Sequence, residues 1–170
     1  MDGDTSGGIS PISGIDKAFL RHWLVWMQNE GPDGCQPVPE LVAINEQQPT
    51  AELRPPEDKQ TDEDDLMPYE VLDQIERLAI LDKLMPLEAF KYLQTKHPET
   101  SAQQLGVWTI RFFRLWCRNQ WKRERYAPGF HLDDESLDPK TWCRFPILSG
   151  GYNYEIKKLE EHLKSLTQTA

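Results

Sequence analysis

The spacing of hydrophobic side chains predicts a mainly helical chain. Residues 17–28 carry apolar side chains at helical spacing, and Asp16 stands immediately before them in the N-cap position. Gly31 and Pro32 follow, and this pair predicts the end of that helix. The pattern is then irregular and rich in proline, with one short strand expected over residues 40–45.

Two prolines mark helix starts in the second half of the chain. Pro68 and Pro86 each suit the first position of a helix, where the missing amide hydrogen costs no hydrogen bond. The second of these helices would run to Lys96, and residues 153–166 predict a final amphipathic helix. We therefore expect a loop-rich segment, a helical core and a C-terminal helix, over residues 31–66, 67–126 and 150–170.

A long helix with a cationic face is the most informative element of the pattern. Ser101 and Gln104 form a capping-box signature, and we expect the helix that they begin to reach about Tyr126. At helical spacing, five cations fall within a sector roughly 80° wide: Arg111, Arg114, Arg118, Lys122 and Arg125. Cations on one face of a helix repel one another, so we expect negative charge opposite them. The candidates are the acidic segment of residues 57–65 and a phosphorylated ligand. A solvated basic face is the simpler alternative.

Composition and charge narrow the classes of function. A chain of 170 residues with 38% hydrophobic content can bury one core. The net charge of −9 opposes general binding to nucleic acid or to an anionic membrane. The three cysteines lie far apart and form no C-x-x-C pair, which favours neither a disulfide framework nor a zinc ribbon. No signal-peptide pattern or long apolar run is present, so we expect a soluble, cytoplasmic protein.

Two polar stretches raise the question of ligand chemistry. Residues 57–65 hold six acids and no apolar side chain, but they lack the turn-forming glycine of a calcium loop. We therefore expect a mobile charged loop there and no metal site. The opening residues 6–9 match the first four positions of the S-G-G-x-D-S loop of ATP pyrophosphatases, and the required Asp is absent. On this local pattern alone, a flexible turn is favoured over a phosphate-binding loop.

A combination of four stretches carries a resemblance to a known family. The stretches are GDTSGGISPISGIDK, PTAELRPPEDKQTDEDDLMPYEVLD, RNQWKRERYAPGF and WCRFPI, over residues 3–17, 49–73, 118–130 and 142–147. Together they resemble the C-terminal part of the synthetase domain of a bacterial glutamine-dependent NAD synthetase. The resemblance implies a helical C-terminal portion of a Rossmann-like α/β domain of the adenine nucleotide alpha hydrolase, or ATP pyrophosphatase, kind.

The resemblance also implies an ATP-dependent amide ligase reaction. ATP adenylates the carboxylate of deamido-NAD, and ammonia from an N-terminal glutaminase domain then displaces AMP. Lys17 aligns with a lysine that contacts the ATP phosphates, and Thr50 aligns with a hydroxyl residue at the same nucleotide. Lys122 aligns with a lysine that binds deamido-NAD, with Trp121 beside it. The resemblance further implies Mg²⁺ with the ATP and a homo-oligomer.

This chain departs from the family pattern at several points. Gly8 stands where ammonia-dependent relatives carry an Asp, and Trp121 stands where they carry a His. Asp62 and Glu63 become candidate lid residues over ATP. The ATP pyrophosphatase loop, the main metal ligands and the glutaminase domain have no counterpart, so we expect a fragment that holds no catalytic residue and is inactive alone. The alternative is a helical interaction module whose basic helix binds an acidic partner.

Overall fold

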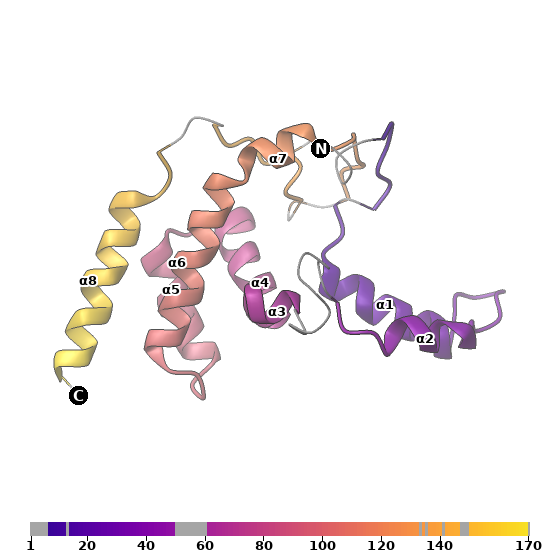
Figure 1. Ribbon diagram of the computed structural model, residues 1–170, viewed down its shortest axis with the longest axis horizontal. Coiled ribbons are helices and arrows are strands. Elements are labelled where there is room, and N and C mark those ends of the chain that lie inside the picture. The colour runs from indigo at the N-terminus through magenta and orange to yellow at the C-terminus, as the bar shows by residue number, and fades with distance from the viewer. Residues whose placement is uncertain are drawn as a thin grey trace. The chain divides into compact units, whose positions relative to one another are not determined.

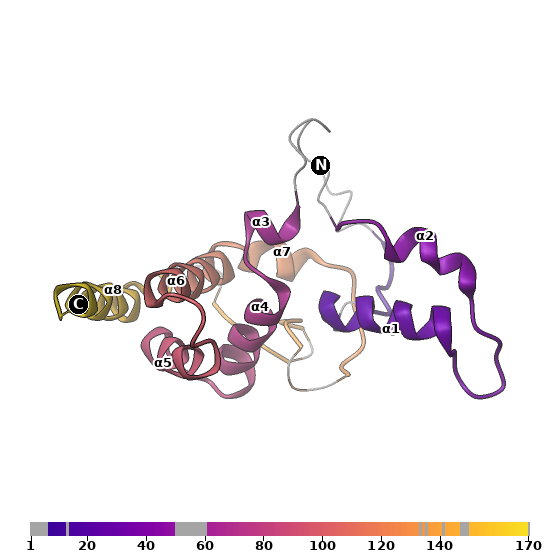
Figure 2. The same cartoon turned by 90° about the horizontal axis from the view of Figure 1, so that it is seen from below.

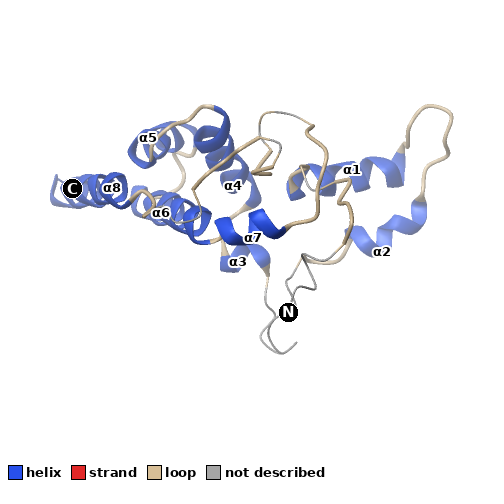
Figure 3. Cartoon of the chain, turned by 90° about the horizontal axis from the view of Figure 1, so that it is seen from above, coloured by secondary structure: helices blue, strands red, loops and turns tan. Residues whose placement is uncertain are grey.

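The computed structural model describes helices joined by turns and loops (Figure 3). The described residues are 7–12, 14–49, 61–132, 134, 136–140, 142–146 and 150–169. No strand occurs among them, and the β-pairing that they show is an isolated parallel bridge between Ser10 and Gly129. The chain divides into two units, one of Met1–Gly14 with Val71–Ala170 and the other of Ile15–Glu70.

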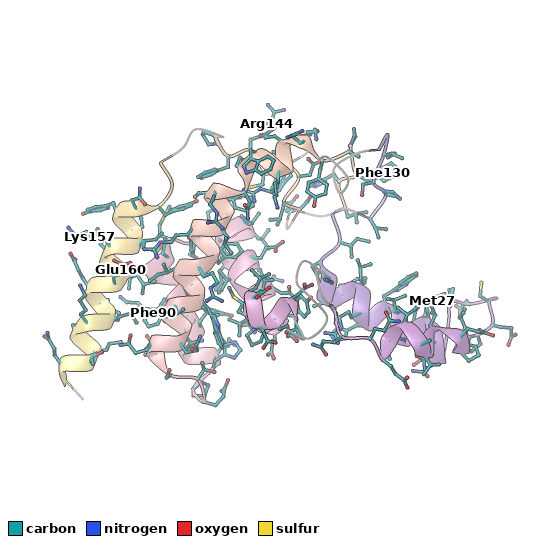
Figure 4. The ribbon with its side chains drawn as sticks, viewed as in Figure 1. Met27, Phe90, Phe130, Arg144, Lys157 and Glu160 are labelled. Carbon is teal, nitrogen blue, oxygen red and sulfur yellow. The ribbon has the colours of Figure 1, made fainter. Side chains whose placement is uncertain are left out.

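Three helices form the centre of the larger unit. They are α5 (Pro86–Lys96), α6 (Ala102–Arg118) and α8 (Asn153–Thr169), and each packs against the other two (Figures 1 and 2). Their facing side chains are fully buried and apolar: Phe90, Leu93, Leu105, Phe113 and Leu159. The ring of Phe90, which is labelled in Figure 4, meets His162 of α8 edge-on, with the two ring centroids 5.9 Å apart. This apolar burial is the main stabilising contribution in the unit.

The helix starts predicted at Pro86 and Ser101 are confirmed, whereas Pro68 lies one residue before its helix and is not its first residue. Pro86 is the first residue of α5, and the amide of Met85 before it donates to Glu88 at 2.9 Å. The Ser101 hydroxyl caps α6 by accepting from the amide of Gln104 at 3.2 Å. Before α5 the chain forms α4 (Tyr69–Glu76) and a π-helical turn, η4 (Arg77–Leu81).

The expected single helix from Ser101 to Tyr126 is wrong. It is broken at Asn119, whose φ of −95° and ψ of 9° leave the α-helical region, and α7 (Gln120–Arg125) then begins a new direction. Asparagine is a weak helix former, and the next side chain, Gln120, is fully buried. The Gln120 amide donates to Glu124 and its oxygen accepts from Arg123, so the break places a polar side chain in the interior with its hydrogen bonds satisfied.

The smaller unit begins with α1 (Lys17–Asn29). The Asp16 carboxylate caps it by accepting from the amide of Phe19 at 2.6 Å, as the sequence predicts. The helix ends at Asn29 with Glu30 as its C-cap, and Gly31 follows with a φ of +73°, a conformation that glycine adopts without strain.

The strand expected over residues 40–45 is wrong. These residues form a 3₁₀ turn, η2 (Pro39–Leu41), and one turn of helix, α2 (Val42–Asn45). Pro39 sits at the start of the turn, where its fixed φ favours helix, and the Asn45 amide donates to Gln28 of α1 at 2.7 Å.

Part of the acidic segment is also helical. Residues 57–60 lie outside the described residues, but Asp62–Asp65 form the short helix α3, so the expectation of a loop does not hold for these four. The Thr61 hydroxyl caps the helix by accepting from the amide of Asp64 at 3.1 Å. The four carboxylates in this first helical turn also interact favourably with the positive end of the helix dipole.

No helix in the part of the chain that the structure describes has the length and apolar character needed to cross a membrane.

Candidate functional site

Lys17 lies in a small polar cluster at the start of α1. Its ammonium forms an ion pair with the Asp62 carboxylate of α3, and the Tyr69 hydroxyl donates to the same carboxylate oxygen at 3.0 Å. Half of the Lys17 side chain is exposed, whereas Asp62 is 18% exposed. The structure therefore brings together the expected phosphate-contacting lysine and one of the two candidate lid residues.

The electrostatics of this cluster follow from its hydrogen bonds. Partial burial alone would raise the pKa of Asp62, but the hydrogen bonds from Lys17 and Tyr69 outweigh it and lower that pKa. Partial burial likewise opposes the charge on Lys17, yet the hydrogen bonds to Asp62 and Tyr69 raise its pKa. Burial, followed by the hydrogen bond to Asp62, raises the pKa of the Tyr69 phenol. At neutral pH the cluster is thus a charged pair with a neutral phenol.

Glu63 has a different role from its neighbour Asp62. Its carboxylate accepts from the backbone amide of Tyr69 at 2.9 Å, so it supports the first turn of α4. Thr50 lies outside the described residues. The residue before it, Pro49, accepts a hydrogen bond from the amide of Asp62 at 3.2 Å, so this part of the backbone reaches the Lys17 cluster.

Trp121 and Lys122 lie side by side on α7 in the other unit. The Trp121 side chain is 45% exposed, and two cations approach its ring. The Lys122 nitrogen is 5.9 Å from the ring centroid and the Arg125 guanidinium carbon is 5.8 Å from it. An exposed aromatic face flanked by cations can bind a ligand that carries both a flat ring and negative charge.

The opening segment lies against the chain that follows α7. The amide of Ser10 donates to the Pro128 carbonyl at 2.9 Å, and Gly14 lies so close to Phe130 that a Cβ would be 3.2 Å from its carbonyl oxygen. Gly8 is exposed, with no atom within 4 Å of the position where a Cβ would lie. The segment therefore has a packing role at Ser10 and Gly14, while open space surrounds Gly8.

The cationic face of α6 has an acidic partner that the sequence did not reveal. Arg114 pairs with Glu160 of α8 at 2.9 Å, and Glu160 is labelled in Figure 4. Asp62 pairs with Lys17. A groove of about 660 Å³ follows this face, lined by alternating cations and apolar side chains that include Arg111, Arg114, Arg118, Val107, Ile110 and Leu115.

The described residues offer no ready metal site. No group of three or more His, Cys, Asp or Glu side chains among them is placed to hold a metal ion. Asp62 is engaged by Lys17 and Tyr69, and Glu63 by the Tyr69 amide.

Residues 2–123 match the model of the family described as NAD synthase. The chain belongs to the NAD synthase family. It is 39% identical over 145 residues to the glutamine-dependent NAD(+) synthetase of Aquifex aeolicus, which covers 85% of this chain and 22% of that protein. The corresponding enzyme of Drosophila melanogaster is 28% identical over 169 residues, which covers 95% of this chain and 21% of that protein.

A solved structure agrees with this assignment to the NAD synthase family. The crystal structure of a glutamine-dependent NAD(+) synthetase from Cytophaga hutchinsonii superposes with a TM-score of 0.70 at 40% identity, covering 94% of this chain and 23% of that one. The chain thus spans about a fifth of the length of the relatives that it matches. The family and the helical fold expected from the four stretches are confirmed.

Several residues near the candidate contacts were missed by sequence reasoning. Tyr69 and Arg21 join the Lys17 cluster, and Arg123 stacks its guanidinium 3.6 Å from the centroid of the Trp116 ring. The position of Arg21 one helical turn after Lys17 was the available signal for that residue. Tyr69 had no local signal, because only the fold brings its ring to Lys17 and Arg21.

Proposed function

We propose that the chain forms part of the ATP and deamido-NAD sites of a glutamine-dependent NAD synthetase. The observation that carries the proposal is the match of residues 2–123 to the NAD synthase family, because that range contains Lys17, Thr50, Trp121 and Lys122. In this reaction ATP adenylates the nicotinate carboxylate of deamido-NAD and releases pyrophosphate. Ammonia then attacks the acyl-adenylate, and AMP leaves as the amide forms.

Lys17 and Thr50 suit the nucleotide side of this reaction. A carboxylate is a poor acyl donor, so the reaction needs the triphosphate held while its α-phosphate is attacked. A lysine ammonium offsets negative charge on the phosphates, and a hydroxyl donates to a phosphate oxygen. The half-exposed side chain of Lys17 is within reach of a ligand in solution.

Trp121 and Lys122 suit the dinucleotide side. The exposed ring of Trp121 offers a stacking surface to a pyridine or an adenine ring. Lys122 and Arg125 place positive charge around that ring, where the pyrophosphate of a dinucleotide would be stabilised. Trp121 stands where ammonia-dependent relatives carry a histidine. Its ring can stack on the ligand, but the hydrogen bond of that histidine is lost.

The Mg²⁺ that accompanies ATP finds no set of ligands among the described residues, and we derive no step through it. We further propose that ammonia comes from a glutaminase domain and that the synthetase is a homo-oligomer. A cytoplasmic setting suits the three free cysteines, because a reducing compartment keeps thiols unpaired.

Titration calorimetry of the chain with deamido-NAD tests this role for α7. Lys122→Ala is expected to weaken binding by roughly ten- to a hundredfold, because it removes a charge-assisted contact worth about 1.5–3 kcal/mol. Folding should survive, because Lys122 is exposed. Arg114→Ala is the matched control: it removes a cation of the preceding helix α6 that is already paired with Glu160. Equal, small effects of the two substitutions would remove Lys122 from the site.

A further inference from the structure

One carboxylate oxygen in the Lys17 cluster is bound as a phosphate oxygen would be. Asp62 Oδ2 accepts from the Lys17 ammonium and from the Tyr69 hydroxyl, the latter at 3.0 Å. An ammonium and a hydroxyl converging on one anionic oxygen are the donors that phosphate sites use. The oxygen of Asp62 therefore marks a position that is built for an anion.

Arg21 places a second cation beside the Tyr69 ring. It lies one helical turn after Lys17 on α1, its side chain is exposed, and its guanidinium carbon is 5.7 Å from the centroid of the Tyr69 ring. The Lys17 nitrogen is 6.0 Å from the same centroid. The exposed Arg21 side chain is within reach of a ligand in solution.

The Tyr69 side chain is held firmly enough to serve as the base of such a site. It is only 8% exposed, and its backbone amide donates to Glu63 at 2.9 Å. A ring fixed in this way orients its hydroxyl and presents its electron-rich face to nearby cations. Two donors from two helices thus converge on one anion position, and Arg21 lies against the ring that carries one of them.

We propose that Lys17, Arg21 and Tyr69 bind a phosphate group of ATP, and that Asp62 occupies this position until ATP displaces its carboxylate. The proposal rests on the proposed function, since it names further residues and an internal competitor for the ATP contact of Lys17. Displacement is feasible because half of the Lys17 side chain is exposed, and ion pairs in contact with water are weak. A triphosphate carries several negative charges, so it attracts these cations more strongly than the single carboxylate that it displaces.

The direction in which Asp62→Asn changes the affinity for ATP decides the role of Asp62. If its carboxylate competes with phosphate, Asp62→Asn removes the competitor and strengthens ATP binding. If the carboxylate only orients Lys17, or closes over ATP as a lid, the same change weakens binding. The side chain of Asn is nearly the same size, so the packing of α3 against Tyr69 is retained.

The test is titration calorimetry of the full chain with ATP and with inorganic tripolyphosphate. Arg21→Ala is expected to weaken both ligands roughly tenfold by removing a charge-assisted contact, and Arg21→Lys to restore part of the loss. Tyr69→Phe keeps the ring and is expected to cost roughly threefold to tenfold through the lost hydroxyl. Asp62→Asn is expected to tighten both ligands several-fold. Arg144→Ala, an exposed arginine of the other unit (Figure 4), is the control and should change neither affinity.

The outcomes separate this proposal from the one on which it rests. If Lys17→Ala weakens ATP binding while Arg21→Ala and Tyr69→Phe bind as the unaltered chain does, the proposal is overturned and the ATP contact of Lys17 stands. Weaker binding by Asp62→Asn overturns the competitor role. If the unaltered chain binds neither ligand, or if Lys17→Ala has no effect, both are overturned. Circular dichroism verifies the fold of each variant, and the exposed Arg21 keeps the test valid should Tyr69→Phe lose structure.

Discussion

At the scale of single residues, the ion pair of Lys17 and Asp62 stabilises the folded chain over a definite range of pH. A carboxyl group whose pKa is lowered on folding stabilises the folded state at pH values above its pKa in the unfolded chain. This stabilisation is lost as the pH falls through the pKa of the folded state. For Asp62 the ordinary value is 3.8, so the loss lies in the acidic range below it. The pKa of Lys17 is raised above its ordinary 10.5, so its contribution is complete below that value and is lost at higher pH.

We expect carbon-detected NMR to show Asp62 titrating below 3.8. Lys17→Met should raise the pKa of Asp62, because it removes both a hydrogen bond and a favourable charge. Tyr69→Phe should raise it less, because only a neutral donor is lost. An unchanged titration in the Lys17→Met chain would falsify the pairing.

Arg123 is a second residue whose environment sets its role. Burial lowers its pKa to about 10, so it remains a cation at neutral pH. Its guanidinium lies 3.6 Å from the Trp116 ring centroid and donates to the Trp116 carbonyl and to Gln120. A planar group with several donors makes all of these contacts together, and a lysine ammonium does not.

Arg123→Lys is therefore expected to lower the free energy of unfolding by about 1–3 kcal/mol, although the charge is kept. Urea denaturation followed by fluorescence measures the change. Lys91→Ala, at an exposed position on α5, is the control and should stay within about 0.5 kcal/mol of the unaltered chain. If the Arg123→Lys variant were as stable as the unaltered chain, the stacked geometry would contribute nothing.

At the scale of elements, the close approach of α6 and α8 depends on one glycine. A Cβ at Gly106 would lie 2.4 Å from Leu163 Cδ1 and 2.8 Å from its Cδ2. Leu163 is itself buried, so it has little room to move. Glycine costs the helix about 1 kcal/mol relative to alanine, and the packing of α8 explains why it is nevertheless suited to this position.

Gly106→Ala is expected to destabilise the chain by about 1–2 kcal/mol, because overpacking exceeds the gain in helix propensity. The double variant Gly106→Ala with Leu163→Ala should lose less stability than the sum of the two single variants, since the smaller side chain relieves the overlap. Thermal and urea denaturation provide these values. Val107→Ala, on the exposed side of the same helix, is the control. Strict additivity would mean that the two residues do not meet.

At the scale of the whole molecule, the two units differ in how much they bury. The helix α1 of the smaller unit has no buried residue, and apolar side chains on it remain exposed, including Phe19, Trp23 and Trp26. In the larger unit, α5 and α6 bury most of their apolar faces. Because local stability follows the apolar surface that is removed from water, the units should open with different free energies.

Hydrogen exchange measured by mass spectrometry is expected to show this difference. Amides of α1 should exchange faster than amides of α5 and α6, with protection in the last two approaching that of global unfolding. Peptides covering η2 and α2, which also lack buried residues, should behave as α1 does. Equal protection across both units would contradict the assignment of low local stability to α1.

The sequence by itself determined the family, the helical class and most helix starts. Caps and prolines act through neighbouring backbone groups, so Asp16, Pro86 and Ser101 marked their helices correctly. The pairing of Trp121 with Lys122 was also visible, because adjacent residues remain near each other in any fold. The break at Asn119 was not predicted, since it depends on the interior that receives Gln120.

Only the tertiary structure decided which distant charges meet. Lys17 and Asp62 are 45 residues apart, and Arg114 and Glu160 are 46 apart. Nothing in the local pattern distinguishes these acids from the other acidic side chains of the chain. The selection comes from the fold, which brings the Asp62 carboxylate to Lys17 and packs α8 against α6. The sequence therefore named Lys17, Lys122 and Asp62, while the fold added Tyr69 and Arg21 and showed that Asp62 pairs with Lys17.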